Sequence, residues 1–167
     1  TTAEQVLVCL DTFLDRRTAY TFGVSASGVR FDRFHASDDE GVADSGFDPV
    51  WEAKTRADGL GWTAELWIPF TQLRFNDRSE QVWGLNVRRF IPTLEEEVYW
   101  VMVPRTERAW ASRFGDLRGI TGVRPASRAE VLPFVVGSST MNGNRDRRNP
   151  FDDGRNLASR VGVDLKI

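Results

Sequence analysis

The chain has 167 residues, of which 41% are hydrophobic and 28% charged, values close to those of globular domains and unlike those of disordered or collagen-like chains. Its 22 basic and 24 acidic side chains leave a formal net charge of -2, which offers no general attraction to nucleic acid or anionic membranes. No apolar run approaches the ~20 residues of a membrane-spanning helix. We therefore expect one globular domain with a short appendage and no nucleic-acid partner.

Short segments of alternating apolar and polar residues predict strands along most of the chain. Asp11 and Asp15 flank the first turn and are expected to hold it through Arg17 or Thr18. Asp58-Gly59 is a dipeptide typical of a hairpin turn. The expected strands cover residues 5–11, 18–25, 50–56, 61–68, 81–91 and 98–104, with one helical turn at 69–73 and an acidic loop at 35–48. This regular spacing predicts an all-β fold, an antiparallel β-sandwich.

The composition changes near Pro125. Residues 1–124 contain 15 basic and 19 acidic side chains, a net charge of -4, whereas residues 125–167 contain 7 and 5, a net charge of +2. We therefore predict a sandwich domain over 1–124 and an amphipathic strand pair over 125–167, with strands at 129–137 and 158–167. Alternation of this kind is typical of a hairpin packed on a soluble sheet and of the first strands of a membrane barrel, and both interpretations stay open.

Four segments together carry a resemblance to a known family. They are Leu10-Asp11-Thr12-Phe13 through Tyr20-x-Phe22, Gly61-Trp62-Thr63 through Ile68-Pro69-Phe70, Trp83-Gly84-x-Asn86-Val87, and Arg113-Phe114-Gly115-Asp116-Leu117. In this order they resemble the family 9 carbohydrate-binding module. More closely, they are similar to the family 9-like domain of bacterial surface proteins of unknown function, in which that domain precedes a predicted outer-membrane barrel.

The resemblance implies a β-sandwich, a sugar-binding surface and export from the cytoplasm. In the best known members two tryptophans hold a terminal sugar, and Trp110 occupies the place of the second. The first would fall at about Thr1, while Leu7 and Gly23 stand where a glutamate and an arginine of the sugar pocket are expected.

The candidate carbohydrate-binding residues are therefore Trp110, Arg113 and Trp51. Family members also carry strands upstream of the segment matching 5–11. We therefore expect an N-terminally incomplete sandwich whose open strand edges promote self-association and need an upstream segment, a partner chain or a rearranged fold to cover them.

Most other aromatic and sulfur-containing side chains are expected in the core. Alternation places Trp62 on the apolar face of its strand, opposite Trp67. Trp83, Trp100 and Met102 lie within expected strands and are predicted to pack inside. The lone Cys9 is predicted to be a buried thiol, because free cysteine is among the most buried residue types.

Metal and cofactor sites have weaker sequence signals. Asp38, Asp39, Asp44 and Asp48 could offer oxygen ligands to calcium, although such an acidic run is also typical of a solvated loop. His35 is expected on a surface loop. Haem ligation, which related sandwiches use, would draw on His35, Met102 and Met141; the predicted core role of Met102 argues against it.

No nucleophile with an adjacent base and no defined carboxylate pair is apparent, and residues 95–97 are expected to form a solvated turn. We predict a noncatalytic carbohydrate-binding-like module of a bacterial cell-surface protein linked to polysaccharide breakdown, with an oligo- or polysaccharide as partner. The alternative is a structural domain that has lost sugar binding and serves an outer-membrane barrel in the same polypeptide. Both imply an extracytoplasmic location, with the export signal upstream of this chain.

Overall fold

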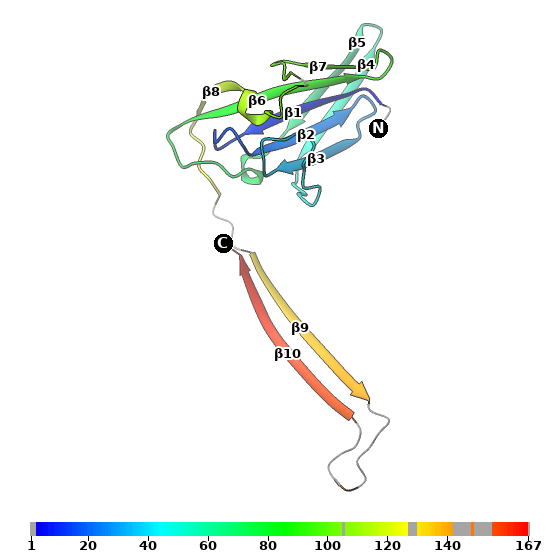
Figure 1. Ribbon diagram of the computed structural model, residues 1–167, viewed down its shortest axis with the longest axis vertical. Helices are drawn as coiled ribbons and strands as arrows, with labels where there is room; N and C mark the ends of the chain where they lie inside the picture. Colours follow the sequence, from blue (N-terminus) through cyan, green and yellow to red (C-terminus); the bar gives the residue numbers. More distant parts are fainter. Residues whose placement is uncertain (1–2, 105, 127–129, 142–147, 149–154, 167) are drawn as a thin grey trace. The chain divides into compact units, whose positions relative to one another are not determined.

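The computed structural model describes residues 3–104, 106–126, 130–141, 148 and 155–166. The chain divides into two compact units, Thr1–Ala126 and Ser127–Ile167. The described residues form antiparallel strands and two short 3-10 helices, with no α-helix among them (Figure 1). The predicted all-β, antiparallel fold class is confirmed. In this part of the chain, no helix combines the length and the apolar character needed to cross a membrane.

The larger sheet of the first unit has the strand order β3-β2-β1-β6-β7, and β8 also pairs with β6. β7 pairs with the end of β6 and β8 with its beginning, so the two short strands share one edge. The bounds are β1 Gln5–Asp11, β2 Ala19–Ser25, β3 Arg30–His35, β6 Glu80–Ile91, β7 Glu96–Tyr99 and β8 Gly115–Thr121.

The second layer is a single hairpin, β4 (Glu52–Asp58) and β5 (Gly61–Trp67), which packs on one face of the larger sheet (Figure 1). Ala53 and Leu66, paired across the hairpin, contact the core. Trp67 points the other way and is 61% exposed. The expected helical turn follows as η1 (Phe70–Gln72). The sandwich is therefore built of two unequal layers.

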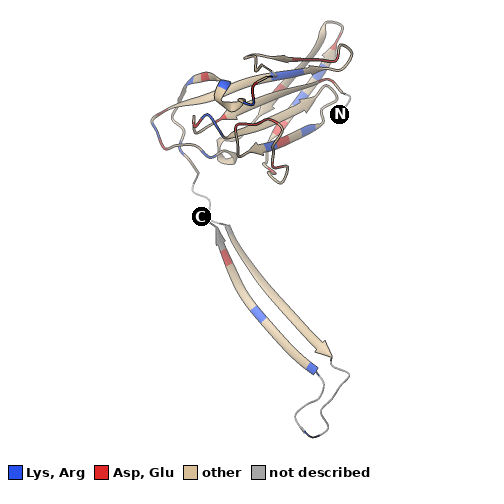
Figure 2. Ribbon diagram, viewed as in Figure 1, with Lys and Arg blue, Asp and Glu red and all other residues tan. Residues whose placement is uncertain are grey.

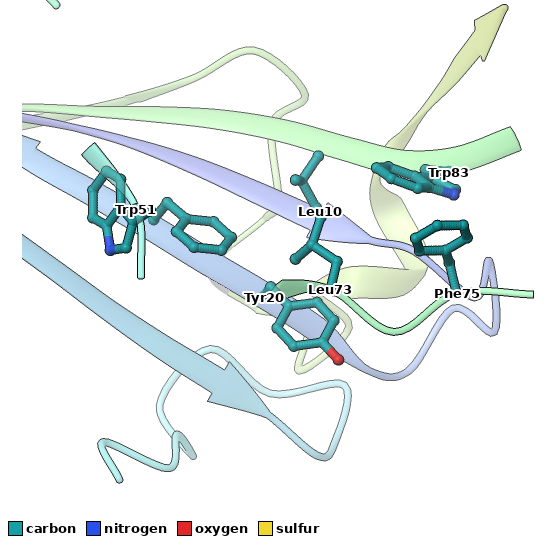
Figure 3. Close-up of a cluster of buried hydrophobic side chains, with 7 residues drawn as sticks. Leu10, Tyr20, Trp51, Leu73, Phe75 and Trp83 are labelled. Carbon is teal, nitrogen blue, oxygen red and sulfur yellow. The ribbon is translucent and has the colours of Figure 1, made fainter. Parts of the chain in front are cut away.

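An aromatic core fills the space between these layers (Figure 3). The rings of Phe70 and Phe75 both lie 5.4 Å from that of Trp83, an edge and tilted geometry that aromatic pairs prefer. Trp83 is 1% exposed, as predicted. The core cluster consists of Leu10, Tyr20, Phe22, Trp51, Leu73, Phe75 and Trp83.

The opposite face of the larger sheet has its own apolar cluster. Because side chains alternate along a strand, Leu10 and Tyr20 face the aromatic core while Cys9 and Ala19 face this second cluster. The predicted burial of Cys9 is confirmed. The second cluster consists of Leu7, Cys9, Ala19, Trp110, Ala111 and Phe114.

Two aspartates hold the turn between β1 and β2, as predicted. The Asp15 carboxylate accepts hydrogen bonds from the backbone N–H of Arg17 (2.8 Å) and from the N–H (2.7 Å) and hydroxyl (2.8 Å) of Thr18. Asp11 accepts from the N–H groups of Asp15 and Arg16. Burial raises the pKa of Asp11, against the opposing effect of these hydrogen bonds.

Three features of the larger sheet differ from the sequence prediction. β3 and β8 were not anticipated, because Arg30–His35 and Gly115–Thr121 mix charged residues and glycine with the apolar ones. The strand expected over 98–104 instead runs from Glu96 to Tyr99. Residues 96 and 97, predicted to lie in a solvated turn, are paired with the end of β6.

Two residues predicted to fill the core lie at the surface instead. Trp100 is 60% exposed and Met102 is 79% exposed. The reason is the early end of β7 at Tyr99, after which alternation no longer directs side chains into a sheet face. The Trp100 ring covers Gly115, where an added Cβ would lie 2.9 Å from it.

The second unit is a hairpin of β9 (Glu130–Met141) and β10 (Arg155–Lys166), paired in register along twelve residues each. Directly paired residues share a face. The face that carries Val135 opposite Val161 is apolar from Val131 to Val135 and also carries Arg155 opposite Met141, whereas the other mixes apolar residues with Arg160 and Asp164. The charged positions of the hairpin's described side chains lie on β10 (Figure 2).

Candidate functional site

Two loop segments lie against the outer face of the larger sheet, the face of Cys9 and Ala19. We call residues 36–48 the acidic loop and residues 106–114 the covering segment. Asp38 joins them: one carboxylate oxygen accepts from the N–H groups of Trp110 (2.8 Å) and Ser112 (3.0 Å), and the other accepts from the Ser112 hydroxyl (2.6 Å). Burial raises the pKa of Asp38, but these hydrogen bonds outweigh it and leave the pKa below its usual value.

His35 lies beneath this junction, at the end of β3. It is 1% exposed, in contrast to the predicted surface position, because the unanticipated strand β3 turns it onto the covered face. Its ring centroid is 4.3 Å from that of Trp110, and Nε2 is 3.1 Å from the Thr21 hydroxyl oxygen. Burial lowers the pKa of His35, although the Asp39 carbonyl and the Glu40 carboxylate oppose this effect.

A pocket of about 530 Å³ opens beside β7, between the acidic loop and the covering segment. Its size falls within the roughly 300–1,000 Å³ typical of small-molecule sites. Carboxylates, one phenol, one guanidinium and a short apolar wall line it. The lining residues are Asp39, Glu40, Glu97, Tyr99, Met102, Val103, Pro104, Glu107, Arg108, Ala109 and Trp110.

An ion-pair cluster organises one wall of the pocket. The Arg88 guanidinium pairs with Glu40 (2.7 Å) and with Glu97, two carboxylates that come from different parts of the chain. The Tyr99 hydroxyl donates to Glu40 at 3.0 Å, and Arg88 lies over the Tyr99 ring. Burial, followed by the charge of Glu40, raises the pKa of Tyr99 well above its usual range. The phenol therefore stays protonated and acts as a hydrogen-bond donor.

The predicted sugar-binding residues do not come together. Trp110 is 3% exposed, and its ring packs on His35 and Phe114. Trp51, also 3% exposed, belongs to the aromatic core, and its indole N–H donates to Asp32. Arg113 is exposed and pairs with Glu107. Stacking of a sugar on Trp110 would require the covering segment to open.

The aspartates proposed for calcium are engaged within their own loops. Asp39 and Asp44 each accept a hydrogen bond from a backbone N–H two residues ahead, and Asp38 holds the covering segment. Asp48 lies exposed near the loop's end. Among the described residues, no three His, Cys, Asp or Glu side chains converge as a metal site. The four aspartates are therefore not assembled around a common point.

Within the first unit, the two residues considered for haem do not share an environment. His35 is buried with Nε2 against Thr21. Met102 is 79% exposed at the pocket, and Met141, 74% exposed, belongs to the other unit. The Thr21 hydroxyl also contacts the Cys9 sulfur at 3.5 Å. Burial raises the pKa of Cys9 to about 12, so this thiol is not activated by the neighbouring histidine.

The cluster of Glu40, Arg88 and Tyr99 was not predicted from the sequence. One signal was present: Arg88 and Arg89 stand side by side within an expected strand, so alternation must turn one of them to each face. An arginine on a covered face needs carboxylate partners, but the sequence does not show which ones. Glu40 is 48 residues away in the chain.

Comparisons with known proteins found no match: no protein-family model, no curated protein and no solved structure is similar to this chain.

Proposed function

We propose that the first unit is a noncatalytic carbohydrate-binding module, similar to family 9, and that it binds a saccharide in the pocket beside β7. The observation that supports this proposal most strongly is that the Tyr99 hydroxyl donates to both Glu40 and Glu97 in a pocket of about 530 Å³. Carboxylates accept hydrogen bonds from sugar hydroxyls, and Arg108 can donate to ring or glycosidic oxygens. Met102 and Pro104 offer an apolar wall to the C–H surface of a sugar ring.

The charges around the pocket support binding and not hydrolysis. Glycoside hydrolysis uses one protonated acid and one free carboxylate across the scissile bond. Glu40 and Glu97 instead both pair with Arg88 on one wall of the pocket, and so they do not face each other across it as a separate acid and base. The resemblance noted in the sequence supports a bacterial cell-surface setting for this module, in a protein linked to polysaccharide breakdown.

We expect oligosaccharides to bind the wild-type chain and to bind a Met102→Ala, Glu107→Ala double variant at least tenfold more weakly. Both side chains line the pocket, and neither should be needed for folding because Met102 is 79% exposed and Glu107 forms only an exposed ion pair. Isothermal titration against a panel of neutral, acidic and amino oligosaccharides measures the affinity.

Glu65→Ala, an exposed position on β5, is the matched control and should bind like wild type. Absence of binding across the panel, or equal affinity in the double variant, would show that the pocket is not a saccharide site.

A second function is favoured by the hairpin of the second unit. Five aliphatic side chains on one face are more than half exposed: Val131, Val135, Leu157, Val161 and Val163. A lone two-stranded hairpin is at best marginally stable in water, so such a face favours an apolar environment. We propose, as the alternative, that the chain is a structural domain attached to an outer-membrane partner in the same polypeptide.

In this alternative, the chain should float with lipid vesicles, and paired Val135→Asp and Val161→Asp changes should reduce the floated fraction several-fold. The matched control places aspartate at Ser138 and Ala158, which are paired on the opposite face. Equal flotation of both variants, or none for wild type, would exclude a lipid-facing hairpin.

A further inference from the structure

His35 connects the two segments that shape the pocket. The acidic loop contributes Asp39 and Glu40 to its lining, and the covering segment contributes Trp110. The His35 ring packs on Trp110, and its Nδ1 is buried without a hydrogen-bond partner in the described residues. Asp38 joins the covering segment to the acidic loop directly above this ring. A change in the charge of this ring therefore acts on both pocket segments.

The surroundings of His35 favour a neutral ring. Glu40 attracts a proton, Arg33 on the same strand repels it, and Asp39 and Val42 present backbone carbonyls. The neighbours on β1 and β2, Cys9 and Thr21, are uncharged. Asp38 and Asp11 lie on the same covered side of the sheet. The cost of burying the charge exceeds the attraction, so the pKa lies below its ordinary value.

The burial of His35 makes the separation of the acidic loop from the covering segment depend on pH. When the two segments separate, His35 becomes solvated and regains a pKa of about 6.5. The open state then binds more protons than the closed state, so acidification below about pH 6.5 favours opening until the closed-state pKa is reached. Asp11 acts in the opposite direction, because its raised pKa means that protonation stabilises the closed fold.

We propose that His35 is a proton-operated latch of the pocket: the neutral ring packs under Trp110 and lets the covering segment stay closed against the acidic loop, and the protonated ring releases the two segments. The idea that this latch controls saccharide release rests on the function proposed above. The pH-dependent opening itself does not, because it can be measured on the protein without a saccharide. Acidification would then disassemble the pocket without unfolding the aromatic core on the other face of the sheet.

The chain contains one histidine and one cysteine, and both lie under the covering segment, which makes the test direct. Cys9 is labelled with 4,4′-dithiodipyridine from pH 7.5 to 4.5, and each rate is divided by that of the urea-unfolded chain at the same pH. We expect this ratio to increase up to tenfold per pH unit below about pH 6.5. In His35→Gln, which retains an amide near Thr21 but does not titrate, the ratio should be flat.

Far-ultraviolet circular dichroism, which follows the strands, should stay constant over the same range. A flat wild-type ratio, or the same increase in His35→Gln, would overturn the latch. If His35→Gln does not fold, NMR titration of the single histidine decides: coincidence of its midpoint with the change in labelling supports the latch, and titration without such a change contradicts it. No saccharide is used, so this result is independent of the binding experiment.

Discussion

Trp83→Ala is expected to lower the free energy of unfolding by about 3–5 kcal/mol, the cost of emptying a large aromatic site in a packed core. Trp83 is 1% exposed, packs against Phe70 and Phe75, and donates its indole N–H to Gln81. Its loss removes contacts on several sides and leaves the buried Gln81 carbonyl oxygen without this donor. Urea denaturation followed by circular dichroism measures the change.

Trp67→Ala provides the matched control, because it deletes the same side chain from the exposed face of β5. A surface substitution of this kind should change the free energy of unfolding by no more than about 0.5 kcal/mol. Similar losses in the two variants would mean that β4 and β5 do not form the second layer over the larger sheet.

The two tryptophans also show what alternation can predict. Within regular strands it assigned sides correctly: Trp83 is inside and Trp67 is outside. The turn aspartates were predictable for a different reason, since Asp15 bonds groups only two and three residues away. Local chemistry of this kind is visible in the sequence.

Features that depend on where a strand ends, or on distant partners, were not predictable. Trp100 and Met102 were expected inside because the alternating pattern continues past Tyr99, where the observed strand stops. β3 was missed because Arg30, Asp32 and Arg33 interrupt its apolar pattern. His35 was consequently expected on a loop.

The candidate site illustrates the same limit. Its carboxylates come from the acidic loop, β7 and the covering segment, and only the folded sheet brings Glu40 to Arg88. Trp110, which was expected to stack on a sugar, lies in this region, but the sequence could not show that His35 and Phe114 pack on its ring. The proposed site therefore moves from the tryptophan faces to the pocket beside Tyr99.

Asp38→Ala is expected to lower the free energy of unfolding by about 2–3 kcal/mol and to loosen the covering segment first. The carboxylate satisfies the N–H groups of Trp110 and Ser112 as well as the Ser112 hydroxyl, and donors that lose a charged partner in a partly buried setting are costly. Denaturation measures the global loss, and hydrogen exchange of residues 110–112 measures the local one.

Asp48→Ala is the control, because Asp48 is an exposed position in the same acidic loop. It should change the unfolding free energy by about 0.5 kcal/mol at most, which separates the effect of the Asp38 hydrogen bonds from that of loop charge.

The effect of pH gives a further check. Because the pKa of Asp38 is lowered in the folded state, its stabilisation is complete above the unfolded value of about 3.9 and is lost as the pH falls through the folded value. The stability difference between wild type and Asp38→Ala should therefore shrink below about pH 4. A difference that persists at pH 2, or equal losses in the two alanine variants, would contradict the assignment of Asp38 as the charged acceptor that fastens the covering segment to the acidic loop.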